Sequence, residues 1–252
     1  MIESVFKRHG IEAVVHIAAK AGVRNSVQNP YEYNEVNING TLNLLNVARD
    51  SDVERFIFAS SSSVYGNPQY LPIDEKHPTN PVSPYGVTKL ACEKYCLFFE
   101  HAYALKTILL RFFTVYGPRQ RPDEAIHKFT RLIFENRPIT IYGDGNQTRD
   151  FTYVDDIVRG IELALKSNVS GEVFNLGSGK RISVNELVDL LEKYSGKEVK
   201  RVYIEKQLGD VSNTWASIEK AKHMLGYEPK VDIEEGVKRF IEWWQRSVKK
   251  RV

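Results

Sequence analysis

The sequence predicts an α/β fold built on a parallel sheet, because apolar strand-like runs alternate with helical ones. We expect strands at 13–18, 55–60 and 107–112, and helices near 30–51 and 83–104. Uninterrupted apolar runs are typical of parallel strands that helices bury on both faces. The 252 residues, 42% of them hydrophobic and 27% charged, suffice for a sizeable core.

Local signals justify the later elements in turn. Ser83 suits the N-cap of the second predicted helix and Pro84 its first position, so this helix should begin just before Tyr85. Such a start directs Tyr85 toward the carboxyl ends of the strands, where open parallel sheets bind their ligands. After Tyr116 the elements become shorter and are separated by Gly and Pro. We therefore expect a second, smaller α/β part to begin there.

Composition and charge exclude several classes of function. The net charge is only +3, and Lys and Arg are spread along the chain apart from the basic run 249–251, so nucleic acid is not an expected partner. No stretch approaches the roughly 18 apolar residues of a membrane span, and no secretion signal is visible, so we expect a cytoplasmic protein. Cys92 and Cys96 lie one helical turn apart without a His cluster, which favours free thiols over metal ligands.

The most informative residues are Tyr85 and Lys89, in the pattern Y-x-x-x-K. Four residues make about one helical turn, so both side chains should project from the same face of the helix. A nearby ammonium lowers the pKa of a phenol from its usual value near 10 and so favours phenolate as a general base. The hydroxyl of Ser61, which lies upstream, could share the proton that is moved.

These residues belong to a series of motifs that resembles the extended short-chain dehydrogenase/reductases, specifically their nucleotide-sugar epimerase branch. The matching segments follow the order of that family along nearly the whole chain. They are 16–19, 37–41, 60–66, 85–89, 111–118, 149–156, 175–179 and 209–211. The resemblance implies a Rossmann-type parallel sheet, with 1–116 as a partial NAD-binding domain and 117–252 as a mainly UDP-sugar-binding domain whose segments interweave with it.

The resemblance also implies three catalytic roles. Tyr85 would take the proton of the sugar C4 hydroxyl while hydride leaves C4 for NAD. Lys89 would bind the nicotinamide ribose and stabilise the phenolate, so that both residues also contact the cofactor. Ser61 falls at the catalytic Ser/Thr position, and Ser60 would lie beside the cofactor in the same turn.

Other matched positions imply binding roles. Ala18 and Ala19 would let the cofactor approach the backbone closely, and Asn37 would tie that loop together by hydrogen bonds. The guanidinium of Arg149 suits bidentate contact with the UDP diphosphate. Asp210 would contact the uridine ribose or orient that arginine.

Two features bear on the substrate and the reaction. Thr114 stands where UDP-glucose/galactose epimerases usually carry Asn, and the charge of Arg119 or Arg121 could accommodate a C6 carboxylate, as in UDP-glucuronate 4-epimerases. Ser62 and Ser63 would contact the substrate and stand where sugar 4,6-dehydratases carry Asp and Glu. Elimination of water needs such an acid and base, so the serines favour epimerisation.

One departure from the family concerns the first half-domain. Family members begin with a strand, a G-x-x-G-x-x-G turn and a helix that hold the NAD pyrophosphate. This chain has no such segment, and residues 2–8 resemble the helix before the fourth strand, so roughly 50 to 60 residues of the usual half-domain are missing. An apolar strand edge should then be bare. We rank a late start codon first, a shortened cloned segment second and a natural variant third.

The sequence thus predicts a NAD-dependent UDP-sugar 4-epimerase that oxidises C4, lets the 4-keto intermediate rotate and reduces it again. Both the glucose/galactose and the glucuronate/galacturonate pairs stay open. The alternatives are a non-catalytic nucleotide-sugar-binding fragment without the dinucleotide loop, or another sugar-nucleotide dehydratase or reductase. The resemblance alone implies a homodimer through the helices near 30–51 and 83–104. Whether these residues bind NAD by themselves is left open.

Overall fold

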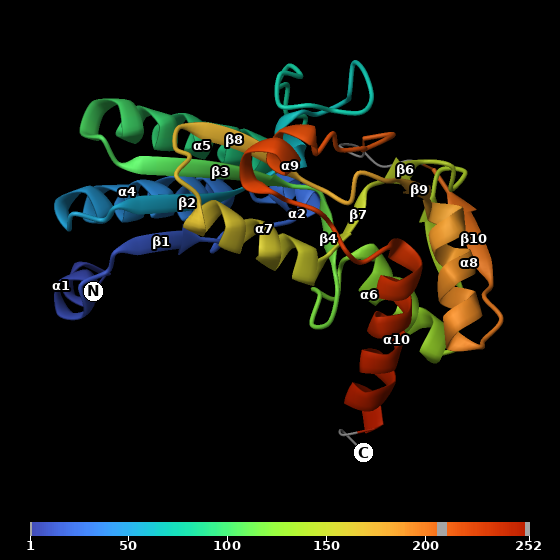
Figure 1. The fold of residues 1–252 in the computed structure, drawn as a ribbon. Helices are drawn as coiled ribbons and strands as arrows, with labels where there is room; N and C mark the ends of the chain where they lie inside the picture. The colour runs from blue at the N-terminus through green and yellow to red at the C-terminus, as the bar shows by residue number, and fades with distance from the viewer. Residues whose placement is uncertain (1, 206–210, 250–252) are drawn as a thin grey trace.

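A four-stranded parallel sheet forms the centre of the computed structural model, which describes residues 2–205 and 211–249 (Figure 1). Its strand order is β1-β2-β3-β8. The strands are β1 (Ala13–His16), β2 (Arg55–Ser61), β3 (Lys106–Phe112) and β8 (Glu172–Leu176). The three strands expected from the sequence are confirmed, with ends that differ by at most two residues.

Helices cover both faces of this sheet (Figure 1). Successive residues of β2 show why both layers are needed. Phe56 and Phe58 lie in one apolar core, and Ile57 between them lies in another, because neighbouring strand residues point to opposite faces. One core involves α4 (Gly40–Asp50) and α5 (Pro84–Tyr103), and the other involves α7 (Val154–Lys166) and α9 (Glu219–Leu225).

The first part of the chain contains several shorter helices. They are α1 (Ile2–His9), α2 (Val23–Gln28), α3 (Pro30–Tyr33), the π-helix η1 (Asn34–Asn39) and the 3-10 helix η2 (Ser62–Val64). The helix expected near 30–51 is therefore three consecutive pieces, α3, η1 and α4. The sequence reasoning did not anticipate α2.

The later part of the chain surrounds a separate apolar core, with α6, α8 and α10 at its centre (Figure 1). Its elements are β4 (Thr114–Tyr116), α6 (Ala125–Phe134), β5 (Ile139–Tyr142), β6 (Thr148–Arg149), β7 (Phe151–Tyr153), β9 (Ile182–Ser183), α8 (Val184–Ser195), β10 (Arg201–Ile204) and α10 (Ile233–Lys249). Since β8 returns to pair with β3, the two parts interweave. The division at residue 117 stays a prediction.

One edge of the central sheet is formed by β1. Within the described residues, β1 pairs with β2 only. Val15 and, just beyond the strand, Ile17 are 39% and 55% exposed. The expectation of a bare apolar strand edge is confirmed for this part of the chain.

Two further expectations concern membranes and thiols. No helix among the described residues is long and apolar enough to cross a bilayer. Cys92 and Cys96 are free and fully buried on α5, and burial raises the pKa of both thiols. The described residues include no group of three or more His, Cys, Asp or Glu placed to hold a metal.

A buried ion pair joins α5 to the sheet. Arg111 on β3 donates from Nε and Nη2 to the two carboxylate oxygens of Glu93 on α5, at 2.8 and 2.7 Å. Ser60 at the end of β2 donates to the same carboxylate at 2.5 Å. Both charged side chains are almost completely buried, so each depends on the other to offset its desolvation.

Removal of either Glu93 or Arg111 alone should therefore lower the free energy of unfolding. We expect Glu93→Leu to lower the free energy of unfolding by ~3 to 5 kcal/mol, because Arg111 would keep a buried charge without its carboxylate. Urea denaturation followed by circular dichroism measures this. The double variant Glu93→Leu with Arg111→Met should be more stable than Glu93→Leu alone, because no unpaired charge is left.

A matched control is the exposed pair of Glu235 with Arg239, 2.8 Å apart on α10. Glu235→Gln should change stability by at most about 1 kcal/mol, since water screens exposed pairs. Equal losses for Glu93→Leu and Glu235→Gln would contradict a structural role for the buried pair.

Candidate active site

A turn of serines follows β2 at the carboxyl end of the sheet. Ser61 is the N-cap of η2, and its hydroxyl accepts a hydrogen bond of 3.1 Å from the backbone N–H of Ser63. The same hydroxyl lies 3.1 Å from the Ser63 hydroxyl. The turn thereby fixes the Ser61 side chain where a strand ends, which is the position the sequence predicted.

The first turn of α5 packs directly on this serine turn. Ser83 caps α5 by accepting from the Gly86 N–H, and Pro84 opens the helix, as predicted. A Cβ on Gly86 would come within 2.5 Å of the Ser63 carbonyl oxygen, so only glycine permits this approach. The approach brings Tyr85 next to the serines, and Ser61 is a hydrogen-bond partner of its phenol.

The electrostatics of Tyr85 differ from the sequence-based expectation. Burial raises the pKa of its phenol above the ordinary value of 10, and the hydrogen bond with Ser61 only partly opposes this. The Lys89 ammonium lies 5.9 Å from the tyrosine ring centroid and donates to the Ala59 carbonyl at 2.7 Å. The expectation of a lowered pKa for Tyr85 is therefore wrong for this structure, although Tyr85 and Lys89 lie on one helix face.

Lys89 itself is only 4% exposed, and burial lowers the pKa of its ammonium to about 8. Its Nζ also lies 4.9 Å from the ring centroid of Phe58 on β2. The Lys89 side chain thus lies between α5 and strand β2.

Asn37 connects the loop after β1 to α5. Its side-chain oxygen accepts from the Lys20 N–H at 2.7 Å, and its nitrogen donates to the Lys20 carbonyl and the Thr88 hydroxyl, both at 3.0 Å. The hydrogen-bonding role expected for Asn37 is therefore present. Asn37 lies in the π-helix η1, and short π-helical segments often occur at functional sites.

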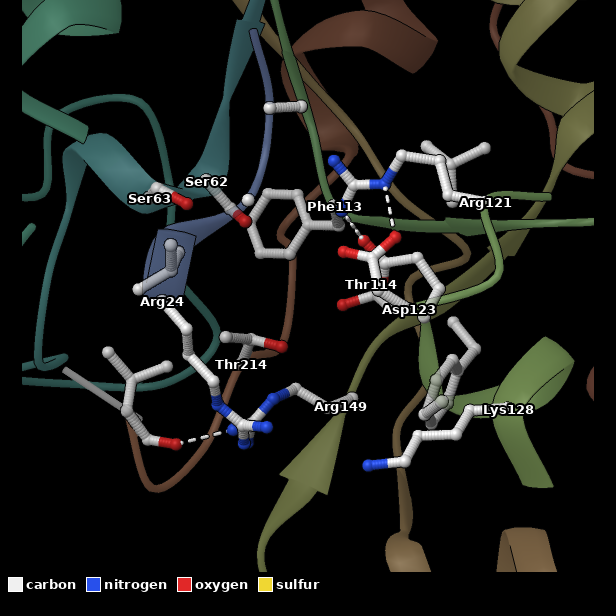
Figure 2. A pocket seen from close by; sticks show the side chains of 18 of the residues that line it. Arg24, Ser62, Ser63, Phe113, Thr114, Arg121, Asp123, Lys128, Arg149 and Thr214 are labelled. Carbon is white, nitrogen blue, oxygen red and sulfur yellow. Dashed lines mark hydrogen bonds and ion pairs between the residues drawn. The ribbon is translucent and has the colours of Figure 1, made fainter. Parts of the chain in front are cut away.

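A cavity of about 940 Å³ opens beside the serine turn and Tyr85 (Figure 2). Segments from both parts of the chain line it. The predicted residues that it brings together are Ser60, Ser61, Ser62, Ser63, Tyr85, Thr114, Arg121 and Arg149. This cavity is large enough for a nucleotide-sized ligand.

The other predicted residues lie elsewhere. Ala18 and Ala19 line a second cavity of about 520 Å³ beside β1, together with His16 and Gly40. Asn37 and Lys89 are buried and line neither cavity. Asp210 lies outside the described residues.

Arg121 and Thr114 also line this cavity (Figure 2). The Arg121 guanidinium contacts Asp123, with 3.2 Å between Nε and Oδ1, and also pairs with Glu124. Arg121 is therefore oriented by two carboxylates. Arg119, the other candidate for this role, is not among the residues that line the cavity.

Arg149 is held by backbone carbonyls. It donates to the oxygens of Val211 at 2.6 Å and of Ser212 at 3.1 Å. The sequence reasoning missed Arg24 of α2, which lines the same cavity with its guanidinium 4.3 Å from the Tyr142 ring centroid. Tyr142, which also lines the cavity, was missed as well.

Asp150 was matched as part of a motif, but its structural role was not foreseen. Its carboxylate is fully buried and accepts from the Ser178 N–H at 2.7 Å, the Gly179 N–H at 3.2 Å and the Ala216 N–H at 3.1 Å. Burial raises the pKa of this carboxyl, and these hydrogen bonds oppose the rise. Asp150 thus joins three segments next to Arg149.

Comparisons with known proteins agree with this geometry. A family model described as GDP-mannose 4,6 dehydratase matches residues 1–240. A UDP-glucuronate 4-epimerase from Thermodesulfobacterium geofontis (strain OPF15) is 45% identical over 249 residues, which cover 98% of this chain and 76% of that protein.

Two solved structures share the fold. A UDP-glucose 4-epimerase from Thermotoga maritima, with UDP-glucose, matches with a TM-score of 0.95 and 39% identity over 98% of this chain and 82% of that one. A UDP-glucuronic acid 4-epimerase from Bacillus cereus, in complex with UDP-glucuronic acid and NAD, matches with a TM-score of 0.93 and 38% identity over 98% and 78%. The chain therefore belongs to the GDP-mannose 4,6 dehydratase family of extended short-chain dehydrogenase/reductases, as its motifs predicted.

Proposed function

We propose that this chain carries the substrate site and the catalytic acid/base group of a cytoplasmic, NAD-dependent UDP-sugar 4-epimerase. The observation that carries the proposal is the position of Tyr85, which meets Ser61 at the end of β2 in a cavity of about 940 Å³. The epimerases that match this chain over nearly its full length support the same reaction.

Several residues of the chain would have separate roles in the inversion at C4. Tyr85 would take the proton of the C4 hydroxyl and return it, with Ser61 sharing that proton through its hydrogen bond to the phenol. Lys89 would contact the nicotinamide ribose of the bound cofactor, and its charge would favour the phenolate form of Tyr85. Ser62 and Ser63 line the cavity without a carboxylate, which supports epimerisation over elimination of water.

The residues present fit the nicotinamide end of NAD. Tyr85 and Ser61 lie at the carboxyl end of the sheet, and Ala18, Ala19 and Gly40 line the second cavity, where small side chains leave room for a planar group. The bound cofactor would supply the chemistry of accepting hydride from C4 and returning it. Ser60 and Asn37 would hold the surrounding loops, since Ser60 is fixed by Glu93 and Asn37 by the Lys20 peptide.

The substrate pair that the cavity suits better is UDP-glucuronate and UDP-galacturonate. Thr114 and Arg121 line one wall and offer a hydroxyl and a guanidinium to a C6 carboxylate. A substrate carboxylate would replace Glu124 as the partner of Arg121. Arg149 would bind the diphosphate, and Asp210, which lies outside the described residues, is proposed to act at the uridine ribose.

Tyr85→Phe tests the proposed base. In the presence of NAD, we expect turnover to fall by on the order of 10²- to 10⁴-fold, because the variant keeps the ring but lacks the proton acceptor. Nuclear magnetic resonance of UDP-glucuronate and UDP-galacturonate follows the reaction. Calorimetry should show UDP-sugar affinity nearly unchanged.

Tyr31→Phe provides the matched control, since Tyr31 is 91% exposed, and it should keep full turnover. Near-normal turnover in Tyr85→Phe would remove Tyr85 as the base. UDP-sugar binding without turnover in the unaltered chain with NAD would show a binding module instead of an epimerase.

Arg121→Gln tests the acid substrate. We expect kcat/KM for UDP-glucuronate to fall roughly 10- to 100-fold, because a charge-assisted bond to the carboxylate is lost, and kcat/KM for UDP-glucose to change less than about threefold. Arg119→Gln removes an equal charge from a residue that does not line the cavity, and it should leave the substrate ratio unchanged. Equal losses of kcat/KM for UDP-glucuronate and UDP-glucose in Arg121→Gln would show that Arg121 does not contact the C6 carboxylate.

A homodimer is part of the proposal. Val87, Tyr95, Phe98 and Tyr103 expose apolar surface on α5, on the face of the sheet shared with α4. Exposed aromatic clusters of this kind mark protein interfaces. Light scattering should give twice the 28.9 kDa chain mass, and Phe98→Glu should lower it toward one chain. A single-chain mass for the unaltered protein would contradict the dimer.

A further inference from the structure

We propose that Arg24 is a second diphosphate-binding residue. It would bind the substrate together with Arg149, but it belongs to the first part of the chain and Arg149 to the later part. The inference rests on the proposed function, because it assigns a new residue to the same cavity. Arg24 lies in the short helix α2, which the sequence motifs do not mark.

The Arg24 guanidinium has a defined place in the cavity. Its central carbon lies 4.3 Å from the ring centroid of Tyr142, and Lys128 Nζ lies 5.8 Å from the same centroid. Cations are attracted to the face of an aromatic ring at such distances. Tyr142 thus holds a cation from α2, in the first part of the chain, beside one from α6, in the second.

Arg24 and Arg149 come from different elements, and their side chains point toward one another in Figure 2. The Arg149 guanidinium is positioned by backbone carbonyls and that of Arg24 by an aromatic ring, so each has its own support. Two planar guanidiniums that converge from different elements can each present paired N–H groups to different oxygens of a diphosphate. A single arginine reaches only one side of such a group.

The charges that line the cavity are unevenly placed. Among the described lining residues, the carboxylates are Asp123 and Glu124, and both contact Arg121. Arg24, Lys128 and Arg149 supply three cationic side chains to another part of the cavity, in the lower half of Figure 2. Ser63 packs on the first turn of α5, which carries Tyr85. In Figure 2, Ser62 and Ser63 lie on the opposite side of the view from Arg149 and Lys128, so a sugar that reaches Tyr85 would leave its two phosphates toward those cations.

Titration calorimetry of the full chain with UDP and with uridine tests the inference. We expect Arg24→Gln to weaken UDP binding roughly 10- to 100-fold, as charge-assisted hydrogen bonds to phosphate are lost. Uridine affinity should stay unchanged, because uridine has no phosphate. The UDP affinity of Arg24→Lys should lie between that of the unaltered chain and that of Arg24→Gln, since an ammonium keeps the charge but not the paired donors. Circular dichroism confirms that each variant folds.

Arg131→Gln is the matched control for charge. Arg131 lines the same cavity but is exposed on α6, 4.0 Å from Glu135, so its loss should change UDP affinity less than about twofold. Tyr142→Leu alone should weaken UDP binding, but in combination with Arg24→Gln it should add less than it costs alone, because part of the effect of the ring acts through Arg24.

The outcomes separate this inference from the proposed function. UDP binding that is unchanged in Arg24→Gln would overturn the role of Arg24 and leave the epimerase proposal standing. Equal losses in Arg24→Gln and Arg131→Gln, or an equal loss of uridine binding, would also overturn it. An unaltered chain that fails to bind UDP would overturn the proposed function and this inference together.

Discussion

The buried ion pair between Arg111 and Glu93 is the interaction on which the rest of the site depends. It joins β3 to α5, and because Ser60 donates to the same carboxylate, it also fixes the end of β2. The Arg111 guanidinium further lies 4.7 Å from the ring centroid of Tyr65, directly after the serine turn. The serine turn and the first turn of α5 are therefore held as one unit. Tyr85 meets Ser61 at a fixed position, as proton transfer requires.

The cavity depends on a second constraint, which is the return of the chain from the later part to the central sheet. β8 pairs with β3, and Asn175 within it accepts from the Tyr65 hydroxyl at 2.7 Å. Asp150 then ties the segment after β8 to the one that carries Arg149. The wall that would select the sugar and bind the phosphates is thus fixed relative to the proposed base. Both parts of the chain therefore line the cavity.

Much of this could be predicted from the sequence, because the signals were local. The apolar runs marked the strands, and Ser83 with Pro84 marked the start of α5. The predictions that failed depend on long-range packing. Helical spacing placed Lys89 and Tyr85 on the same helix face, but it did not reveal that the Lys89 ammonium donates to the Ala59 carbonyl. Arg24 was missed because the six residues of α2 are too short to show periodicity. The role of Asp150 was missed since its partners lie far away in the sequence.

The account assigns one orientation of substrate to this cavity, and a crystal structure of the chain with UDP-glucuronate and NAD tests it most directly. The account predicts the C4 hydroxyl within hydrogen-bond distance of the Tyr85 phenol, with the C6 carboxylate at Thr114 and Arg121 and the diphosphate at Arg149. A nucleotide bound outside the cavity of about 940 Å³, or a C4 hydroxyl turned away from Tyr85 and Ser61, would contradict it.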